Sequence, residues 1–138
     1  MLETERLFLR RWKKSDLAPF STMNADPRVM EFFPNLLTRD QVEGMIERIA
    51  LHFEENGFGL WAAEEKLNQH FIGFIGLQVP NIETPCGPCI EIGWRLNFES
   101  WGKGFATEGA REVLKFAFEN LKLKEVIAMA VKTNFRSL

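Results

Sequence analysis

The sequence Trp101-Gly102-Lys103-Gly104-Phe105-Ala106-Thr107-Glu108 is a glycine-rich turn between a strand-like segment and a long amphipathic segment. Glycines let the backbone come close to a ligand, and the start of a helix presents unpaired N–H groups and the positive end of its dipole. The turn is therefore a candidate site for a phosphate-containing cofactor. A glycine pair before a helix is frequently only a cap, so the neighbouring segments must show whether a cofactor binds here and which one.

The segments on both sides of the turn predict a strand, a helix and a strand. Residues 89–96 form a β-rich apolar run, and residues 125–131 form another. Between them, apolar residues on one face predict a helix from about residue 103 to 121. This order should give a parallel strand pair through a right-handed crossover, with the glycine turn at the ligand-binding edge of the sheet.

The first half of the chain adds helices and further strands. A capping box of Thr38 and Gln41 and an apolar stripe predict a helix over residues 38–56 that ends at Asn56-Gly57. The other expected elements are a strand at 6–12, short helices after Ser15-Asp16 and from Pro27, and strands at 58–63 and 71–79. Short links predict an antiparallel meander. The predicted fold class is mixed α/β, with a mostly antiparallel central sheet flanked by helices.

Length and charge narrow the functional classes. The 138 residues are 46% hydrophobic, which suits one domain over residues 1–138. A formal charge of −2 argues against a nucleic-acid binder, which normally has a basic face. No secretory leader and no run of bilayer-spanning length are recognisable. We expect a cytoplasmic protein with no nucleic-acid or membrane partner.

The two cysteines form Cys86-Gly87-Pro88-Cys89, a spacing also found in thioredoxin-like redox proteins. A redox cysteine pair normally precedes a helix, whereas the next residues here predict a strand. A metal site would need more ligands, and His52 and His70 are the only histidines. We interpret the segment as a turn with incidental cysteines and expect no metal.

Two common phosphate-binding motifs do not match the glycine turn. A P-loop needs Ser or Thr after its Gly-Lys pair, and Lys103 is followed by Gly104. A dinucleotide-binding loop follows the first strand of its unit and carries a third glycine, where this chain has Thr107 after a late strand. The first motif is excluded, and the second is a poor match.

Three segments together resemble the GNAT superfamily of N-acetyltransferases: Glu91-Ile92-Gly93-Trp94-Arg95-Leu96, the glycine turn, and Asn134-Phe135-Arg136-Ser137. The segments Thr4 to Arg10 and Asp26 to Met30 are similar to its RimJ/RimL-type branch, which acetylates protein N-termini and small amines. The resemblance therefore covers nearly the whole chain. It identifies the superfamily specifically and the substrate poorly.

The sequence departs from that family in two places. Glu99 stands where the phosphate loop often begins with Gln or Arg, which matters little because backbone amides do most of the holding. The chain also ends at Leu138, whereas the family normally continues through a helix and final strands. The expected fold is therefore a C-terminally truncated GNAT-like sheet with its parallel strand pair splayed at the CoA site.

The resemblance implies an acetyl-CoA site at this splayed pair. The pantetheine arm would pair with the backbone of residues 94–96, and the pyrophosphate would sit on the amides of the glycine turn. Lys103 would add a charge contact or be a solvated loop lysine. The implied cofactor-binding residues are Trp94, Arg95, Leu96, Trp101, Gly102, Lys103, Gly104, Phe105, Ala106, Thr107 and Asn134.

The family's chemistry is direct attack of a neutral amine on the thioester in a ternary complex. It needs a base, donors to the developing oxyanion and an acid for the leaving thiolate. The resemblance favours Glu91 as the base and Ser137 as the acid. Glu91 could instead be a surface or ion-paired glutamate, and Ser137 could be a terminal residue without a catalytic role. Trp61, Trp94, Trp101, Phe32 and Phe33 would line an amine pocket or, as the better default, pack in the core.

The leading functional hypothesis is an acetyl-CoA-dependent N-acetyltransferase acting on a primary amine. An alternative is a truncated, catalytically weak homologue that binds CoA and acts through a partner chain, and a homodimer is left open. Thiol redox chemistry at Cys86 and Cys89 ranks last.

Overall fold

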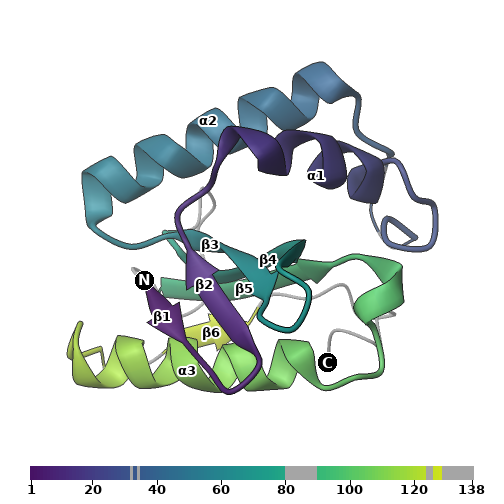
Figure 1. Cartoon of the computed structure of the whole chain (residues 1–138). Coiled ribbons are helices and arrows are strands. Elements are labelled where there is room, and N and C mark those ends of the chain that lie inside the picture. The colour runs from purple at the N-terminus through teal and green to yellow at the C-terminus, as the bar shows by residue number, and fades with distance from the viewer. Residues whose placement is uncertain (32, 34, 80–89, 124–125, 129–138) are drawn as a thin grey trace.

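The computed structural model describes residues 1–31, 33, 35–79, 90–123 and 126–128 (Figure 1). The strands are β1 (Leu2–Glu3), β2 (Leu7–Arg10), β3 (Leu60–Glu65), β4 (His70–Gln78), β5 (Ile90–Leu96) and β6 (Val126–Ala128). The helices are α1 (Leu17–Asn24), α2 (Arg39–Asn56) and α3 (Phe105–Glu119), with short 3-10 turns at Lys14–Asp16 and Phe98–Ser100.

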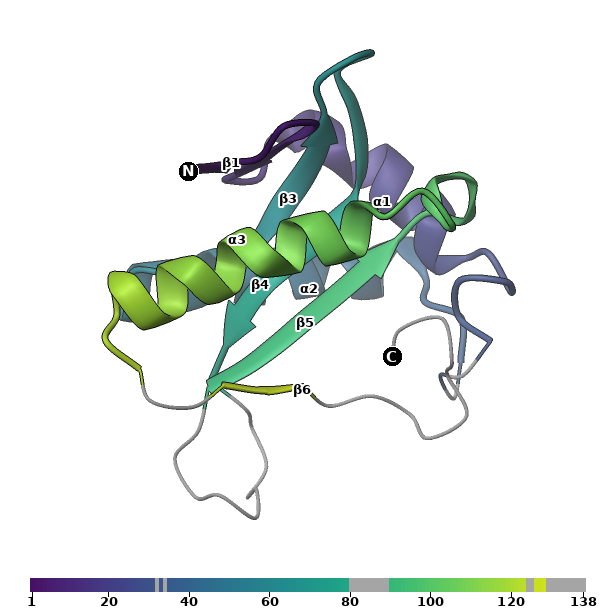
Figure 2. The same cartoon turned by 90° about the horizontal axis from the view of Figure 1, so that it is seen from below.

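The strands form one sheet in the order of the sequence, β1-β2-β3-β4-β5-β6. Neighbours from β1 to β5 are antiparallel, and β6 is parallel to β5, with Ile90 opposite Val126 and Ile92 opposite Ala128. α3 makes the crossover between β5 and β6 (Figure 2). The predicted fold class is therefore confirmed, including the parallel pair.

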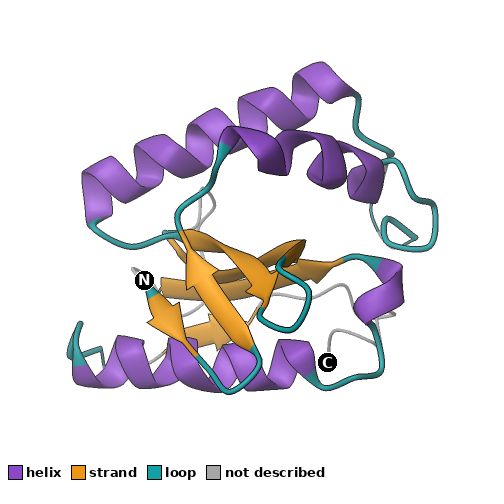
Figure 3. Ribbon diagram, in the orientation of Figure 1, coloured by secondary structure: helices purple, strands orange, loops and turns teal. Residues whose placement is uncertain are grey.

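The helices cover both faces of the sheet. α1 and α2 lie on one face and α3 lies across the other (Figures 1 and 3). α3 comes very close to β4 at Gly109, where an added Cβ would lie 2.3 Å from Cδ1 of the fully buried Ile75. Side chains from both layers are buried against the sheet, among them Leu7, Leu9, Phe20, Val42, Leu77, Val113 and Ala117. This core fixes the start of α3 relative to the sheet.

α2 forms as its sequence predicts. The Thr38 N–H donates to Gln41 Oε1 (2.9 Å), and the Gln41 N–H donates to Thr38 Oγ1 (3.2 Å), which completes the capping box. Val42 and Phe53 of its apolar stripe are buried. Gly57 ends the helix in the left-handed region at φ 75°.

Three local predictions were wrong. Residues 27–31 form turns instead of a short helix: the Asp26 carboxylate caps the Arg28 N–H and the Met30 N–H donates to the Asp26 carbonyl (3.0 Å), but Pro34 follows too soon for this single turn to continue. A 3-10 turn at Phe98–Ser100 separates β5 from the glycine turn, which the sequence predicted to be adjacent. β1 was missed because it is two residues long and pairs only at the sheet edge.

Candidate functional site

The glycine turn has the backbone conformation of an anion cradle. Gly102 and Gly104 lie in the left-handed region at φ 76° and 81°, which residues with a Cβ adopt at a cost. The first bond within α3 runs from the Glu108 N–H to the Gly104 carbonyl (3.0 Å), and no side chain caps the helix among the described residues. The preceding N–H groups, of Phe105, Ala106 and Thr107, therefore have no partner within the helix.

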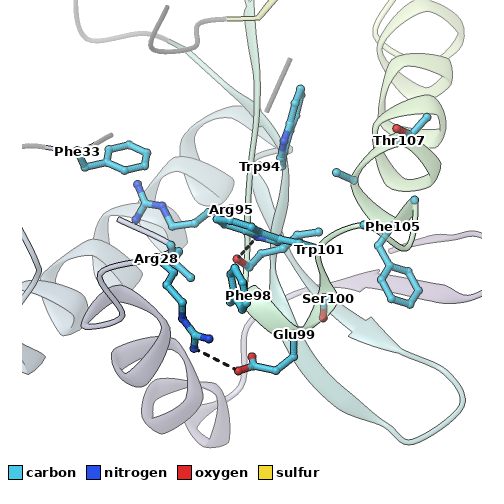
Figure 4. Close-up of a pocket in the computed structure, with 15 residues that line it drawn as sticks. Arg28, Phe33, Trp94, Arg95, Phe98, Glu99, Ser100, Trp101, Phe105 and Thr107 are labelled. Carbon is cyan, nitrogen blue, oxygen red and sulfur yellow. Dashed lines mark hydrogen bonds and ion pairs between the residues drawn. The ribbon is translucent and has the colours of Figure 1, made fainter. Parts of the chain in front are cut away.

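The turn opens onto a cavity of about 900 Å³ (Figure 4). It is lined by Arg28, Val29, Phe33, Trp94, Arg95, Leu96, Phe98, Glu99, Ser100, Trp101, Gly102, Gly104, Phe105, Ala106 and Thr107. The structure thus brings together all the expected cofactor residues except two. Lys103 is exposed and lines a neighbouring hollow beside His70, and Asn134 lies outside the described residues.

One edge of β5 adjoins this cavity with backbone groups that no described strand pairs. The Asn97 N–H donates to the Ile72 carbonyl (2.8 Å), and bonds alternate along an antiparallel pair, so odd-numbered residues of β5 bond to β4. The N–H and C=O groups of even-numbered residues face the other edge. Among the described residues, β6 covers that edge only from Ile90 to Ile92, which leaves Trp94 and Leu96 open.

Trp101 joins the open strand end to the glycine turn. Its indole Nε1 donates to the Leu96 carbonyl (3.0 Å), and its ring centroid lies 5.0 Å from that of Phe98. The Leu96 carbonyl is therefore already occupied. A ligand along this edge has the N–H and C=O of Trp94 and the N–H of Leu96 to bind.

Glu91 lies near the other end of β5 and does not line the cavity. It is half-buried, and Gln78 Nε2 donates to its Oε1 (3.3 Å). Side chains alternate along a strand, so Glu91 shares a face with Arg95, which contacts Asn24 of α1. This face of the sheet is opposite α3. Glu91 and Trp94 are separated by three residues, which is about 10 Å along the strand.

The side of the cavity formed by the turn after α1 was missed from the sequence. Arg28 pairs with Asp26 (2.7 Å) and Glu99 (3.7 Å), and its guanidinium lies 4.1 Å from the centroid of the Phe98 ring. The bond from Arg28 lowers the pKa of Asp26. The sequence marked Asp26 to Met30 as a family likeness and Pro27 as a helix start, and neither signal pointed to Arg28 as a cavity residue.

The aromatic residues divide between the cavity and the core. Trp94, Trp101 and Phe33 line the cavity, whereas Trp61 is buried with its ring near those of Phe53 and Phe116. Phe32 lies outside the described residues. Core packing, the preferred expectation, therefore holds for Trp61, and Trp94, Trp101 and Phe33 also pack against the core while they line the cavity. That they form an amine pocket stays a prediction.

The first turn of α3 is fastened to the N-terminal hairpin. Glu108 accepts hydrogen bonds from the Thr4 hydroxyl, the Arg6 N–H (2.9 Å) and Arg6 Nε (2.7 Å). Arg6 also stacks on Phe105, with 4.3 Å between its guanidinium carbon and the ring centroid. Burial raises the pKa of Glu108, but the hydrogen bonds from Thr4 and Arg6 and the charge of Arg6 outweigh it, so that the pKa is lowered.

We expect Glu108→Gln to lower the free energy of unfolding by about 2 kcal/mol at pH 7, because it removes charge-assisted hydrogen bonds. A lowered folded pKa means that the carboxylate stabilises fully above its unfolded pKa of about 4.3 and loses this effect as pH falls through the folded value. Urea unfolding at several pH values should therefore show the difference from wild type shrinking in acid. Glu119→Gln, at the exposed end of α3, is the control. A difference that does not change with pH would contradict the assignment.

The remaining expectations concern metals, membranes and cysteines. The part of the chain that the structure describes contains no group of three His, Cys, Asp or Glu residues that could hold a metal ion. Within the same residues, no helix is both long and apolar enough to cross a membrane. Cys86, Cys89 and Ser137 lie outside the described ranges, so their expected roles stay predictions.

A family model, a relative and two solved structures that match this chain all belong to acetyltransferases. The model of the acetyltransferase (GNAT) domain matches residues 6–138. The chain is 35% identical over 124 residues to FsC-acetyl coenzyme A-N(2)-transacetylase of Aspergillus fumigatus, a match that covers 83% of this chain and 51% of the relative. Its fold is similar to the crystal structure of an acetyltransferase from Agrobacterium tumefaciens (TM-score 0.84, 26% identity, 99% of this chain and 77% of the other). A spermidine N-acetyltransferase from Vibrio cholerae, solved with CoA and spermine, shares the fold (TM-score 0.67, 22% identity, 89% and 70%).

Proposed function

The chain belongs to the GNAT family of acetyltransferases, and we propose that residues 1–138 act as one domain that moves an acetyl group from acetyl-CoA to a primary amine. The observation that carries the proposal is the left-handed glycine turn at the uncapped start of α3, beside the open edge of β5. The proposed acceptor is a peptide N-terminus or a small amine, as in the RimJ/RimL-type branch that the motifs resemble. A cytoplasmic location and a homodimer stay predictions.

The described residues offer donors that fit acetyl-CoA. The N–H groups of Phe105, Ala106 and Thr107 and the positive end of α3 suit the negative charge of its pyrophosphate. Glycine at 102 and 104 keeps side chains out of this cradle. The amide groups of the pantetheine arm match the N–H and C=O of Trp94, which no described strand pairs, in the way an added strand pairs with a sheet edge.

Acetyl-CoA, when bound, supplies the acetyl group as a thioester. The chain's own task is then to orient the acceptor and move protons. We propose Glu91 as the base that takes a proton from the acceptor ammonium, directly or through a water, because its carboxylate lies on the α1 side of the strand that adjoins the cavity. Ser137 is proposed to donate a proton to the leaving thiolate, and Asn134 to contact the pantetheine arm.

The cofactor site is tested by two glycines with matched geometry. Gly102 and Gly57 have φ of 76° and 75°, and an added Cβ at either would meet nothing within 4 Å. Alanine at each should therefore cost about 1 kcal/mol of folding free energy for the same left-handed strain. Only Gly102→Ala should also weaken acetyl-CoA binding, by about tenfold in the calorimetric Kd, because its Cβ enters the cradle. Equal affinities in the two variants would place the cofactor elsewhere.

Turnover is tested by acetyl-CoA consumption with peptide N-termini, polyamines and aminoglycosides as acceptors. We expect acetyl-CoA to raise the melting temperature and at least one amine class to be acetylated. CoA binding without turnover on any amine would favour the alternative, a binding homologue that acts through a partner chain. Absence of any shift with acetyl-CoA would refute both.

A further inference from the structure

Two arginines of the described residues, Arg28 and Arg95, line the cavity, and they differ in their partners. Arg28 is paired with the carboxylates of Asp26 and Glu99. Arg95 has no carboxylate partner among the described residues: its Nη1 donates to the amide oxygen of Asn24 (2.6 Å), and its buried Nε has no partner. Figure 4 shows the Arg95 side chain extending from β5 toward Phe33. The cavity therefore contains one cation that the described part of the chain does not neutralise.

The surroundings of Arg95 make this charge costly. Its guanidinium carbon lies 4.5 Å from the centroid of the Phe33 ring and 5.4 Å from that of Phe74. Burial lowers the pKa of Arg95 to about 10, so the group is still charged at pH 7. Charged groups in a protein interior are normally paired, and aromatic faces and one amide only partly replace an anion. An anionic ligand group would complete the site.

The position of Arg95 indicates which ligand carries that anion. Its neighbour across the strand pair is Phe74, on the face toward α1, whereas the adjacent Ile75 meets Gly109 of α3 on the opposite face. The proposed pyrophosphate cradle is at the start of α3. Glu91, the proposed base, shares the face of Arg95. The anion that meets Arg95 therefore belongs to the acceptor and not to the cofactor.

We infer that the acceptor is an amine that also carries a carboxylate, and that Arg95 binds this carboxylate. The inference rests on the proposed acetyltransferase function and specifies its acceptor class. A guanidinium binds a carboxylate by short, charge-assisted hydrogen bonds, which Nη2 is left to make because it has no bond to the described residues. The same charge repels a second ammonium group, so polyamines should be poor acceptors.

The test uses acceptors that differ only in this charge. Amino acids are compared with their amides, and glutamate-containing peptides with glutamine-containing ones, all as kcat/KM per neutral amine. Binding of each acceptor is measured in parallel by NMR titration in the presence of CoA, which requires no turnover. The wild type should prefer the carboxylate member of a pair by about tenfold to 100-fold. A phosphate-bearing amine is included to separate carboxylate from general anion binding.

Arg95→Met should abolish this preference while the amides change less than threefold. Arg95→Lys, which keeps the charge, should retain part of it. Arg28→Met is the comparison variant: it removes a cation from the same cavity that is already paired, and should lower the carboxylate-to-amide ratio much less than Arg95→Met does. Circular dichroism and acetyl-CoA affinity check that each variant is folded.

Four results would overturn the inference. The first is equal use of both members of each pair by the wild type. The second is an equal loss for both members in Arg95→Met, which indicates a structural role. The third is a loss of acetyl-CoA affinity alone in Arg95→Met, which assigns the anion to the cofactor. A stronger preference for the phosphate-bearing amine would also contradict it. Carboxylate binding that depends on Arg95 without any turnover would refute the proposed function and support only the assignment of Arg95 as a carboxylate-binding residue.

Discussion

Gly73→Ala should cost about 3 to 5 kcal/mol of folding free energy. Gly73 lies on β4 at φ 142°, and an added Cβ would be 2.0 Å from the Arg95 carbonyl oxygen and 2.8 Å from the Leu96 Cα. Both contacts are with backbone, so no side chain can move away to relieve them. Overpacking of this kind costs about 1–3 kcal/mol and an unfavourable backbone conformation a similar amount. Urea unfolding measures the loss as a lower midpoint.

Gly93→Ala is the control for this prediction. Gly93 lies on the partner strand β5, and a Cβ there would meet nothing within 4 Å. Alanine should be neutral or slightly stabilising. It lowers the conformational entropy of the unfolded chain, which stabilises the folded state by about 0.4–1 kcal/mol. If the unfolding free energies of Gly73→Ala and Gly93→Ala differed by less than about 1 kcal/mol, the close contact between β4 and β5 at Gly73 would be contradicted. Because Arg95 and Leu96 line the cavity, we also expect Gly73→Ala to reduce acetyl-CoA binding.

Glu91→Gln should lower kcat by about 10³-fold, within the range expected for loss of a general base. The substitution preserves the size of the side chain and its position beside Gln78. Affinity for acetyl-CoA should not change, because the proposed cradle is on the other face of the sheet. The residual rate should rise with pH as the neutral fraction of the acceptor amine grows. Steady-state kinetics from pH 6 to 9 with the best acceptor measures both effects.

Gln78→Leu separates catalysis from positioning. It removes the hydrogen-bond donor to Glu91 and leaves the carboxylate in place. We expect only a few-fold loss of kcat, since a positioned base retains most of its effect without one neutral neighbour. Activity of Glu91→Gln within threefold of wild type would assign the base to another residue. Equal losses in the two variants would indicate that the pair acts through the structure of β5.

Much of the fold could be predicted from local sequence signals. The capping box of Thr38 and Gln41 and the C-terminal Gly57 delimit α2 because their hydrogen bonds and backbone conformation are satisfied within a few residues. The turn at Gly102 and Gly104 is also local, since both glycines adopt left-handed conformations next to the helix they start. The short helix expected from Pro27 stops after one turn, capped by Asp26, because Pro34 follows within a few residues and cannot continue it.

The side chains that line the cavity were harder to predict from the sequence. The sequence singled out Arg95 for its backbone, whereas in the structure its charge beside Asn24 and Phe33 is the distinctive feature. Arg28 was not singled out by itself, because its contact with Glu99 joins segments about 70 residues apart. Such contacts follow from the packing of α1 against the sheet. No local pattern reports them.

By itself, then, the sequence determined the order of the main helices and strands apart from β1, the parallel strand pair and the glycine turn at the start of α3, because propensity, capping and backbone conformation act over short distances. Only the tertiary structure decided that Glu108 fastens this turn to Thr4 and Arg6, and that Arg95 meets no carboxylate among the described residues. These relations depend on distances between segments far apart in the chain. They are set when the helices bury their apolar faces on the sheet, which is the step that fixes where each charge finds, or lacks, a partner.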